Sequence, residues 1–261
     1  MRVIVLHTHY QQPGGEDGVF EAEKTLLEVK GHEVIPLILH NRALESMPRR
    51  RQTVVTVWNG ETYHNLRLLI RDKRPQVVHI HNTFPLASPA VVHAAKAEKL
   101  PVVMTLHNYR LLCVNALFFR QGRVCEDCLG HLPWWGVVHG CYRNSRAASA
   151  VVAGMLTFHR FLGTWDMVDR YIVLTEFSRQ KFIQAGFPSE KLVVKPNFVH
   201  PDPGPGEGRG GYALYVGRLS PEKGVRTLLR AWERLGGKVP LKIVGDGPLA
   251  EEVRGAAGRL P

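Results

Sequence analysis

The chain has 261 residues, which is enough for one large domain or two modest ones. Its hydrophobic content of 44% and charged content of 22% are typical of a globular protein and exclude a disordered chain. No apolar run approaches the roughly eighteen residues of a membrane span, and the net charge of +11 favours either anionic partners or solvated Arg-rich helices.

Apolar strands alternate with amphipathic helices along the first part of the chain. Val3–Leu6 is predicted to be a core strand rather than part of a signal peptide, because a single Arg precedes it and polar residues follow at once, so we expect a cytoplasmic protein. The next predicted elements are a helix over Val19–Lys30, strands over Val34–Leu39, Gln76–Asn82 and Pro101–Asn108, a helix over Ala147–Phe158, a strand over Arg170–Glu176, a helix over Glu176–Gly186 and a strand over Lys191–Asn197. This alternation predicts an α/β fold with a parallel sheet covered by helices.

A segment rich in Pro and Gly, Val199–Gly211, reads as a linker to a second βαβα unit. The elements expected after it are strand Tyr212–Val216, helix Pro221–Leu235, strand Leu241–Val244 and helix Pro248–Ala257. We therefore predict a Rossmann-like domain over residues 1–198, with a Cys-rich insertion at 109–145, a linker at 199–211 and a partial second domain over 212–261. So small a second core is either the start of a larger domain or docked onto the first domain, and we expect that the chain is truncated at its C-terminus.

Ligands bind open parallel sheets at the carboxyl ends of the strands, so the loops at that edge are the candidate sites. In "QQPGGEDG", Gly14 and Gly15 allow backbone N–H groups to approach a ligand, and the following helix offers its positive end to an anion. A plain turn explains the same two glycines. The basic cluster Arg49–Arg51 lacks interleaved aromatic residues, so we expect no nucleic-acid partner.

Histidines gather at the ends of three predicted strands. His79 and His81 lie on one face of a strand, and with His7 and His9 they suggest a metal centre; no carboxylate follows at a helpful spacing, and neutral strand-end histidines are the alternative. His107 ends the strand in "TLHNY". Its ring suits a hydrogen bond to a sugar hydroxyl or a phosphate oxygen, a proton-transfer role, or a structural one.

The sequence "YVGRLSPEKGV" predicts a strand, a tight loop and a helix beginning at Pro221, with Ser220 as its N-cap. Arg218 and Lys223 flank that helix beginning and favour binding of a diphosphate. A similar loop follows the next predicted strand and contains Gly245, Asp246 and Gly247. The alternative is two ordinary turns with solvated charges.

In this order, "PGGEDGVFEAEKTLLEVKGHEV", "VVHIHN", "TLHNYR", "LTEFSRQKF", "KLVVKPNFV", "YVGRLSPEKGV" and "LKIVGDGPL" resemble the motifs of family-four retaining glycosyltransferases over nearly the whole chain. That family has the GT-B fold, with two facing Rossmann-like domains. "GRLSPEKG" followed by "IVGDGP" is the most specific part of the resemblance.

The resemblance implies that His107 lies near the transferred sugar, that Gly14 and Gly15 lie near the donor phosphate and the acceptor, and that Arg218 and Lys223 bind the donor diphosphate. It implies a UDP-, GDP- or ADP-linked hexose as donor, a glycan or lipid-linked acceptor, and transfer without a divalent metal. In this family the leaving phosphate deprotonates the acceptor on the same face.

The family's nucleoside-binding loops and paired glutamates lie beyond the point where this chain ends, so we expect this chain to bind a nucleotide sugar weakly. Two other functions stay open: a metal-dependent hydrolase, and a non-catalytic nucleotide-sugar-binding module. The histidines that the hydrolase would use are His7, His9, His79, His81 and His107.

All cysteines fall in the insertion, at Cys113, Cys125, Cys128 and Cys141. Their clustering around "CEDC" favours a structural zinc ion held by four thiolates; reduced thiols, disulfides and an iron–sulfur cluster are the alternatives. In the same insertion, Trp134 and Trp135 suit peripheral contact with the inner face of a membrane, where lipid-linked acceptors lie, or packing around the cysteines.

Overall fold

The computed structural model describes residues 1–11 and 14–258. The chain divides into two compact units, one of residues 1–118 with 126–203 and one of residues 119–125 with 204–261. None of the helices in the described part of the chain is long and apolar enough to cross a membrane.

The first unit is built on a six-stranded sheet with the strand order β2-β1-β3-β4-β7-β8, and every neighbouring pair is parallel. Its strands are β1 (Arg2–His9), β2 (Glu33–His40), β3 (Val77–Ile80), β4 (Val102–Leu106), β7 (Arg170–Val173) and β8 (Leu192–Val194). The predicted parallel sheet is therefore confirmed, and each strand contains or lies within the segment expected from its apolar run.

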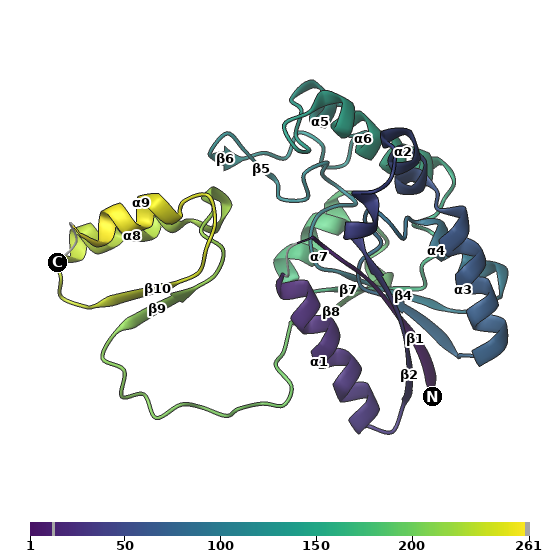
Figure 1. Cartoon of the computed structure of the whole chain (residues 1–261), viewed down its shortest axis with the longest axis horizontal. Coiled ribbons are helices and arrows are strands. Elements are labelled where there is room, and N and C mark those ends of the chain that lie inside the picture. The colour runs from purple at the N-terminus through teal and green to yellow at the C-terminus, as the bar shows by residue number, and fades with distance from the viewer. Residues whose placement is uncertain (12–13, 259–261) are drawn as a thin grey trace. The chain divides into compact units, whose positions relative to one another are not determined.

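Helices lie on both faces of this sheet (Figure 1). The helices of this unit are α1 (Gly15–Val29), α2 (Arg49–Val57), α3 (Gly60–Lys73), α4 (Ala90–Ala97), α5 (Trp134–Val138), α6 (Arg146–Phe161) and α7 (Glu176–Gln184), with short 3₁₀ turns η1 (Asn41–Leu44) and η2 (Ser189–Lys191). Side chains Asn59, Ser145 and Thr175 accept backbone N–H groups at the starts of α3, α6 and α7.

Alternation along β1 decides which residues face which helices. Val3 and Val5 pack against Phe20 of α1, whereas Ile4 and Leu6 join the main core on the opposite face of the sheet. The α3 and α4 side chains of that main core include Leu66, Ile70, Val91 and Val92. From Val3 to Leu6, β1 is thus apolar on both faces, as a doubly covered parallel sheet requires.

The second unit contains a two-stranded parallel sheet of β9 (Ala213–Val216) and β10 (Leu241–Val244). One face packs on α8 (Val225–Leu235) and α9 (Ala250–Ala257) through the buried residues Leu219, Val225, Leu229, Leu249 and Ala256. Residues 119–125 contain a hairpin of β5 (Phe119–Arg120) and β6 (Arg123–Val124).

Two details differ from the sequence prediction in this unit. The segment expected as one helix from Pro221 is a 3₁₀ turn, η3 (Pro221–Lys223), then Gly224 with φ of +70°, then α8. Ser220 does not cap it, because its hydroxyl donates to the Glu222 carboxylate at 2.5 Å rather than accepting a backbone N–H. Glycine at position 224 tolerates the positive φ that separates the turn from the helix.

Candidate functional site

The predicted histidines of the first unit lie together on the α1 side of the sheet, at or near the carboxyl ends of β1, β3 and β4. The register places Val5 beside His79, so His7 and His81 follow on the same face. His81 Nδ1 and His107 Nε2 are 3.0 Å apart, and their rings are stacked with centroids separated by 5.3 Å. The expectation that His79 and His81 share a face is therefore confirmed.

Burial lowers the pKa of three of these rings, His79, His81 and His107. It lowers the pKa of His79 to about 4 and that of His107 to about 4, and it lowers the pKa of His81 well below the ordinary value. His107 Nδ1 is buried and has no hydrogen-bond partner among the described residues. His107 is thus a neutral ring with one unused nitrogen.

The carboxylates that the sequence analysis did not find come from helix α1. Asp17 Oδ1 lies 2.7 Å from His7 Nε2 and 2.9 Å from His9 Nδ1. Glu23 Oε1 lies 3.7 Å from His79 Nδ1, and Glu23 Oε2 lies 3.7 Å from His81 Nε2. Linear spacing missed them because a helix packed on the sheet, not the segment after each histidine, supplies the acid.

Asp17 also changes the interpretation of the glycine loop. Its Oδ2 accepts the Gly14 N–H at 2.8 Å, and the Asp17 N–H donates to the Gly14 carbonyl at 3.1 Å, which closes the first turn of α1. The Gly14 amide is therefore already used within the protein. A Cβ on Gly14 or Gly15 would meet nothing within 4 Å, and residues 12 and 13 of this loop lie outside the described residues.

A second, half-buried polar group lies beside this loop. Asn108 donates to Glu16 Oε1 at 2.7 Å, while Glu16 Oε2 has no partner among the described residues. Burial raises the pKa of Glu16 and raises that of Tyr10 to about 12. The Arg110 guanidinium is buried 4.3 Å from the Phe84 ring centroid. Sequence analysis missed this group, although an Arg directly after "TLHNY" was a signal for it.

In the second unit the loops after β9 and β10 run side by side. Leu219 N donates to the Asp246 carbonyl at 2.8 Å, and Leu249 N donates to the Leu219 carbonyl at 2.9 Å. Arg218 and Lys223 are exposed and form no ion pair with another described residue. Both cations therefore lie beside the loop pair with their charges available to an anion.

Gly245 and Gly247 have a packing role in this loop pair. A Cβ on Gly245 would overlap the Gly217 carbonyl oxygen, and one on Gly247 would lie 2.6 Å from the Leu219 carbonyl oxygen. Their φ angles of +153° and +151° are also rare for other residues. Asp246 Oδ1 accepts the Gly247 N–H at 2.7 Å, so this carboxylate caps its own loop.

Cys113 and Cys128 are buried, and Cys125 and Cys141 are half-buried. The Cys113 thiol donates to Asn115 Oδ1 at 3.0 Å. Two groups of three or more potential metal ligands, each converging within 4.8 Å, occur among the described residues, and neither contains a cysteine. The four-cysteine zinc site stays a prediction.

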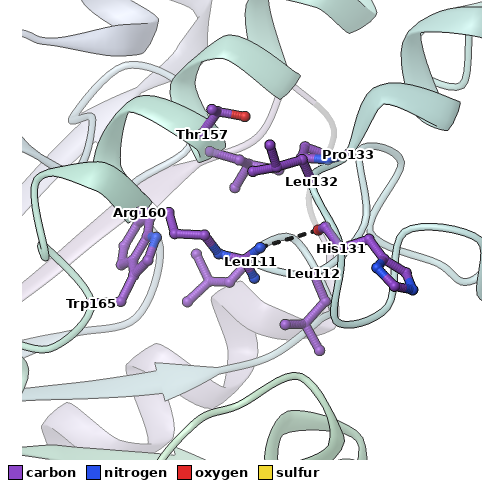
Figure 2. A pocket seen from close by; sticks show the side chains of 9 residues that line it. Leu111, Leu112, His131, Leu132, Pro133, Thr157, Arg160 and Trp165 are labelled. Atoms are coloured by element: carbon purple, nitrogen blue, oxygen red, sulfur yellow. Dashed lines mark hydrogen bonds between the residues drawn. The ribbon is translucent and has the colours of Figure 1, made fainter.

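A small pocket lies elsewhere in the first unit, between the insertion and α6 (Figure 2). It is lined by Leu111, Leu112, His131, Leu132, Pro133, Leu156, Thr157, Arg160 and Trp165. It has room for about one water molecule, and Arg160 Nη1 donates across it to the His131 carbonyl at 3.1 Å. A sugar does not fit there.

Comparison with solved structures identifies the fold. A lipopolysaccharide outer core galactosyltransferase, WaaB in its apo form, matches with a TM-score of 0.54 and 14% sequence identity over 99% of this chain and 65% of that one. The Anabaena protein Alr3699/HepE in complex with UDP matches with a TM-score of 0.51 and 17% identity over 99% of this chain and 66% of that one. This chain thus spans less than two thirds of the length of either protein, and the shared architecture is that of GT-B glycosyltransferases.

The sequence itself matches one family profile, described as a glycosyl transferase 4-like domain, over residues 2–197. Among curated proteins, none matches significantly. The family and the fold support a transferase, and they do not favour the metal-dependent hydrolase or the non-catalytic module that the sequence left open. Because the profile covers well over half of the residues, this chain belongs to the glycosyl transferase 4-like domain family.

Proposed function

We propose that this chain takes part in hexosyl transfer from a nucleotide sugar to a glycan or lipid-linked acceptor, with retention of the donor's anomeric configuration. Family membership supports the transferase class. The observation that carries the donor assignment is the hydrogen-bonded loop pair of the second unit, where Arg218 and Lys223 stand exposed and unpaired with any described acid.

Each cation has a distinct part in holding the donor diphosphate. The planar guanidinium of Arg218 suits two phosphate oxygens at once, and the ammonium of Lys223 acts as a point charge. Negative charge builds up on the leaving diphosphate as the glycosidic bond breaks, so fixed positive charges there stabilise the transition state without a divalent metal. UDP sugars are the first donors to test, because Alr3699/HepE is described in complexes with UDP and with UDP-glucose; GDP- and ADP-hexoses follow.

The first unit supplies the sugar-side groups in this proposal. His107 places one ring nitrogen against His81 and keeps the other without a partner among the described residues, which suits a hydrogen bond to a sugar hydroxyl. The acceptor proton passes to the leaving phosphate on the same face of the sugar. No side chain of the chain needs to form a covalent intermediate.

Calorimetry of the purified chain with UDP-, GDP- and ADP-glucose tests the donor assignment. We expect one of the three to bind, and Arg218→Ala or Lys223→Ala to weaken that binding about tenfold or more, the loss of a charge-assisted contact. Arg230→Ala removes the same charge from an exposed position on α8 and serves as the matched control. Equal binding by all three variants, or no binding by the unaltered chain, would contradict the proposal.

Retention can be tested without knowing the acceptor. Slow hydrolysis of the donor uses water as the acceptor, and nuclear magnetic resonance identifies the anomer released before mutarotation. From an α-linked donor we expect α-glucose first. Release of β-glucose first would establish inversion instead.

We also propose that the acceptor is reached at the inner face of a membrane, in the cytoplasm, as part of polysaccharide assembly. Trp134 and Trp135 on α5 are 56% and 53% exposed, and Phe161 at the end of α6 is 78% exposed. Arg143 and Arg146 follow α5 in sequence. Aromatic rings beside basic side chains are typical of surfaces that bind anionic lipid.

A further inference from the structure

Three potential metal ligands converge beneath helix α1. They are the carboxylate of Glu23 and the rings of His79 and His81, and one ligand atom of each lies within 4.8 Å of the others. Their side chains are only 11%, 7% and 0% exposed. Buried ionisable groups normally pair directly or hold an ion between them.

The spacing leaves room between the acid and each ring. Both nitrogen–oxygen distances, from Glu23 to His79 and to His81, are 3.7 Å, which is beyond hydrogen-bond range. Two ligand atoms on a tetrahedral zinc ion with bonds near 2.0–2.1 Å are about 3.3 Å apart. The two distances run to different Glu23 oxygens, and one ligand atom of each residue lies within 4.8 Å of the others, so a small movement of these side chains would bring them to metal-binding distance.

The far side of each ring is already held by a hydrogen bond. His79 Nε2 lies 2.8 Å from the Thr105 hydroxyl, and His81 Nδ1 lies 3.0 Å from His107 Nε2. If those nitrogens carry the ring protons, the lone pairs of His79 Nδ1 and His81 Nε2 point toward Glu23. Histidine ligands usually donate their other N–H in this way. His81 Nε2 is also buried without a hydrogen-bond partner among the described residues.

The neighbouring group of His7, His9 and Asp17 differs in this respect. Its nitrogen–oxygen distances are 2.7 and 2.9 Å, so both rings already hydrogen-bond the same carboxylate oxygen. That group is closed and needs no ion. Only in the Glu23 group, of these two, are the ring nitrogens too far from the carboxylate oxygens to form hydrogen bonds.

A positive charge already sits at the edge of the open group. Lys195 Nζ lies 2.8 Å from Glu23 Oε2, and its side chain is 36% exposed, so it can swing toward solvent. One carboxylate and two neutral imidazoles are a ligand set that suits zinc. We propose that Glu23, His79 and His81 bind a divalent transition-metal ion, with zinc the best match, and that Lys195 competes with the ion for the Glu23 carboxylate.

Such an ion would be structural and separate from sugar transfer. It would tie α1 to β3, and through the His81–His107 contact it would fix the orientation of the His107 ring. Binding of the ion would therefore make the position of the His107 ring, at the carboxyl end of β4, better defined.

Cobalt titration of the metal-stripped chain tests the proposal, because Co²⁺ bound in a tetrahedral site absorbs visible light. The cysteines can also bind metal, so the titration uses a background in which all are serine: Cys113→Ser, Cys125→Ser, Cys128→Ser and Cys141→Ser. We expect one equivalent of Co²⁺, displaced by Zn²⁺. Glu23→Gln and His79→Gln should lower the affinity at least tenfold, whereas His9→Gln, the matched change in the closed group, should leave it within twofold.

The variant Lys195→Met tests the site without changing any of the three proposed ligands. Removing the competing ammonium should raise the Co²⁺ affinity about tenfold, and circular dichroism checks that the fold is kept. Absence of bound metal, binding that survives His79→Gln, or an affinity unchanged by Lys195→Met would each overturn the site.

Discussion

The close approach of the loops after β9 and β10 makes Gly247 sensitive to a single methyl group. In Gly247→Ala the new Cβ would lie 2.6 Å from the Leu219 carbonyl oxygen and 2.9 Å from its carbon, at a φ of +151°. Strain of this kind costs about 1–3 kcal/mol. Displacing the 2.8 Å hydrogen bond from Leu219 N to Asp246 adds about 1 kcal/mol. We expect the second unit to lose about 2–4 kcal/mol of unfolding free energy.

Gly255→Ala is the matched control, with the same added methyl group in the same unit. Gly255 lies within α9, and a Cβ there would meet nothing within 4 Å. Alanine in a helix interior is favoured over glycine by about 1 kcal/mol, so this change should stabilise the unit. Amide hydrogen exchange at Leu219 and Leu249, followed by mass spectrometry, reports both effects. If Gly247→Ala leaves these amides as protected as before, the close loop contact and the reasoning built on it are wrong.

Three further predictions concern the first unit and the insertion. Burial raises the pKa of Asp17, but hydrogen bonds from His7, Gly14 and His9 outweigh it and lower the pKa, so the stability Asp17 adds is present above about pH 4 and lost as the pH falls through the lowered value. Urea unfolding at a series of pH values should therefore show a shallower acid dependence for Asp17→Asn. Metal analysis should find one zinc equivalent more in the pure protein than in the variant with all four insertion cysteines replaced by serine, and a difference of less than half an equivalent would defeat the cysteine site. Joint replacement of Trp134 and Trp135 by alanine should weaken sedimentation with anionic vesicles about tenfold, whereas Phe177→Ala, at a 63% exposed position on α7, should not.

Local patterns predicted the strands well because buried parallel strands are short apolar runs. The segment Leu241–Val244 was predicted with the bounds that β10 has. Helix α1 was predicted from Val19 but begins at Gly15, since Asp17 closes its first turn through the Gly14 backbone. That contact joins a side chain to a backbone group three residues earlier. The spacing of apolar residues, from which the helix was predicted, contains no information about such a contact.

The histidines of the site could be found from the sequence, but their acidic partners could not be assigned from spacing. Glu23 lies three residues after Phe20 and four before Leu27, both of which pack against the sheet. A charged residue on the sheet-facing side of a helix is the signal that was available. Which histidine it meets depends on how α1 crosses β1 and β3, and that is set by tertiary packing.

The break at Gly224 could not be predicted for a similar reason. Ser-Pro-Glu is a strong helix-start pattern, but here the serine hydroxyl turns to Glu222 and the chain makes one 3₁₀ turn first. The cations of the loop were identified from sequence, whereas the helix beginning beside them lies four residues later than Pro221, at Val225.

The helix N-termini that were predicted to bind phosphate differ in the number of acidic residues in their first turns. The first turn of α1 contains Glu16 and Asp17 and that of α9 contains Glu251 and Glu252, whereas that of α8 contains no acid. A carboxylate in the first turn already interacts with the positive end of the helix and repels a second anion, so α8 is the helix beginning that best suits a phosphate.

Donor binding should therefore depend on the N-terminus of α8 and on the adjacent cations Arg218 and Lys223. The glycines of the loop after β10 should affect binding only through the stability of the second unit. Salt distinguishes the two effects, because added ions screen exposed charges. Affinity for the nucleotide sugar should fall with salt in the unaltered chain and fall less steeply in Arg218→Ala. In Gly247→Ala, binding by the molecules that remain folded should keep the full salt dependence. A salt response that is the same in Arg218→Ala as in the unaltered chain would show that this guanidinium does not meet the diphosphate.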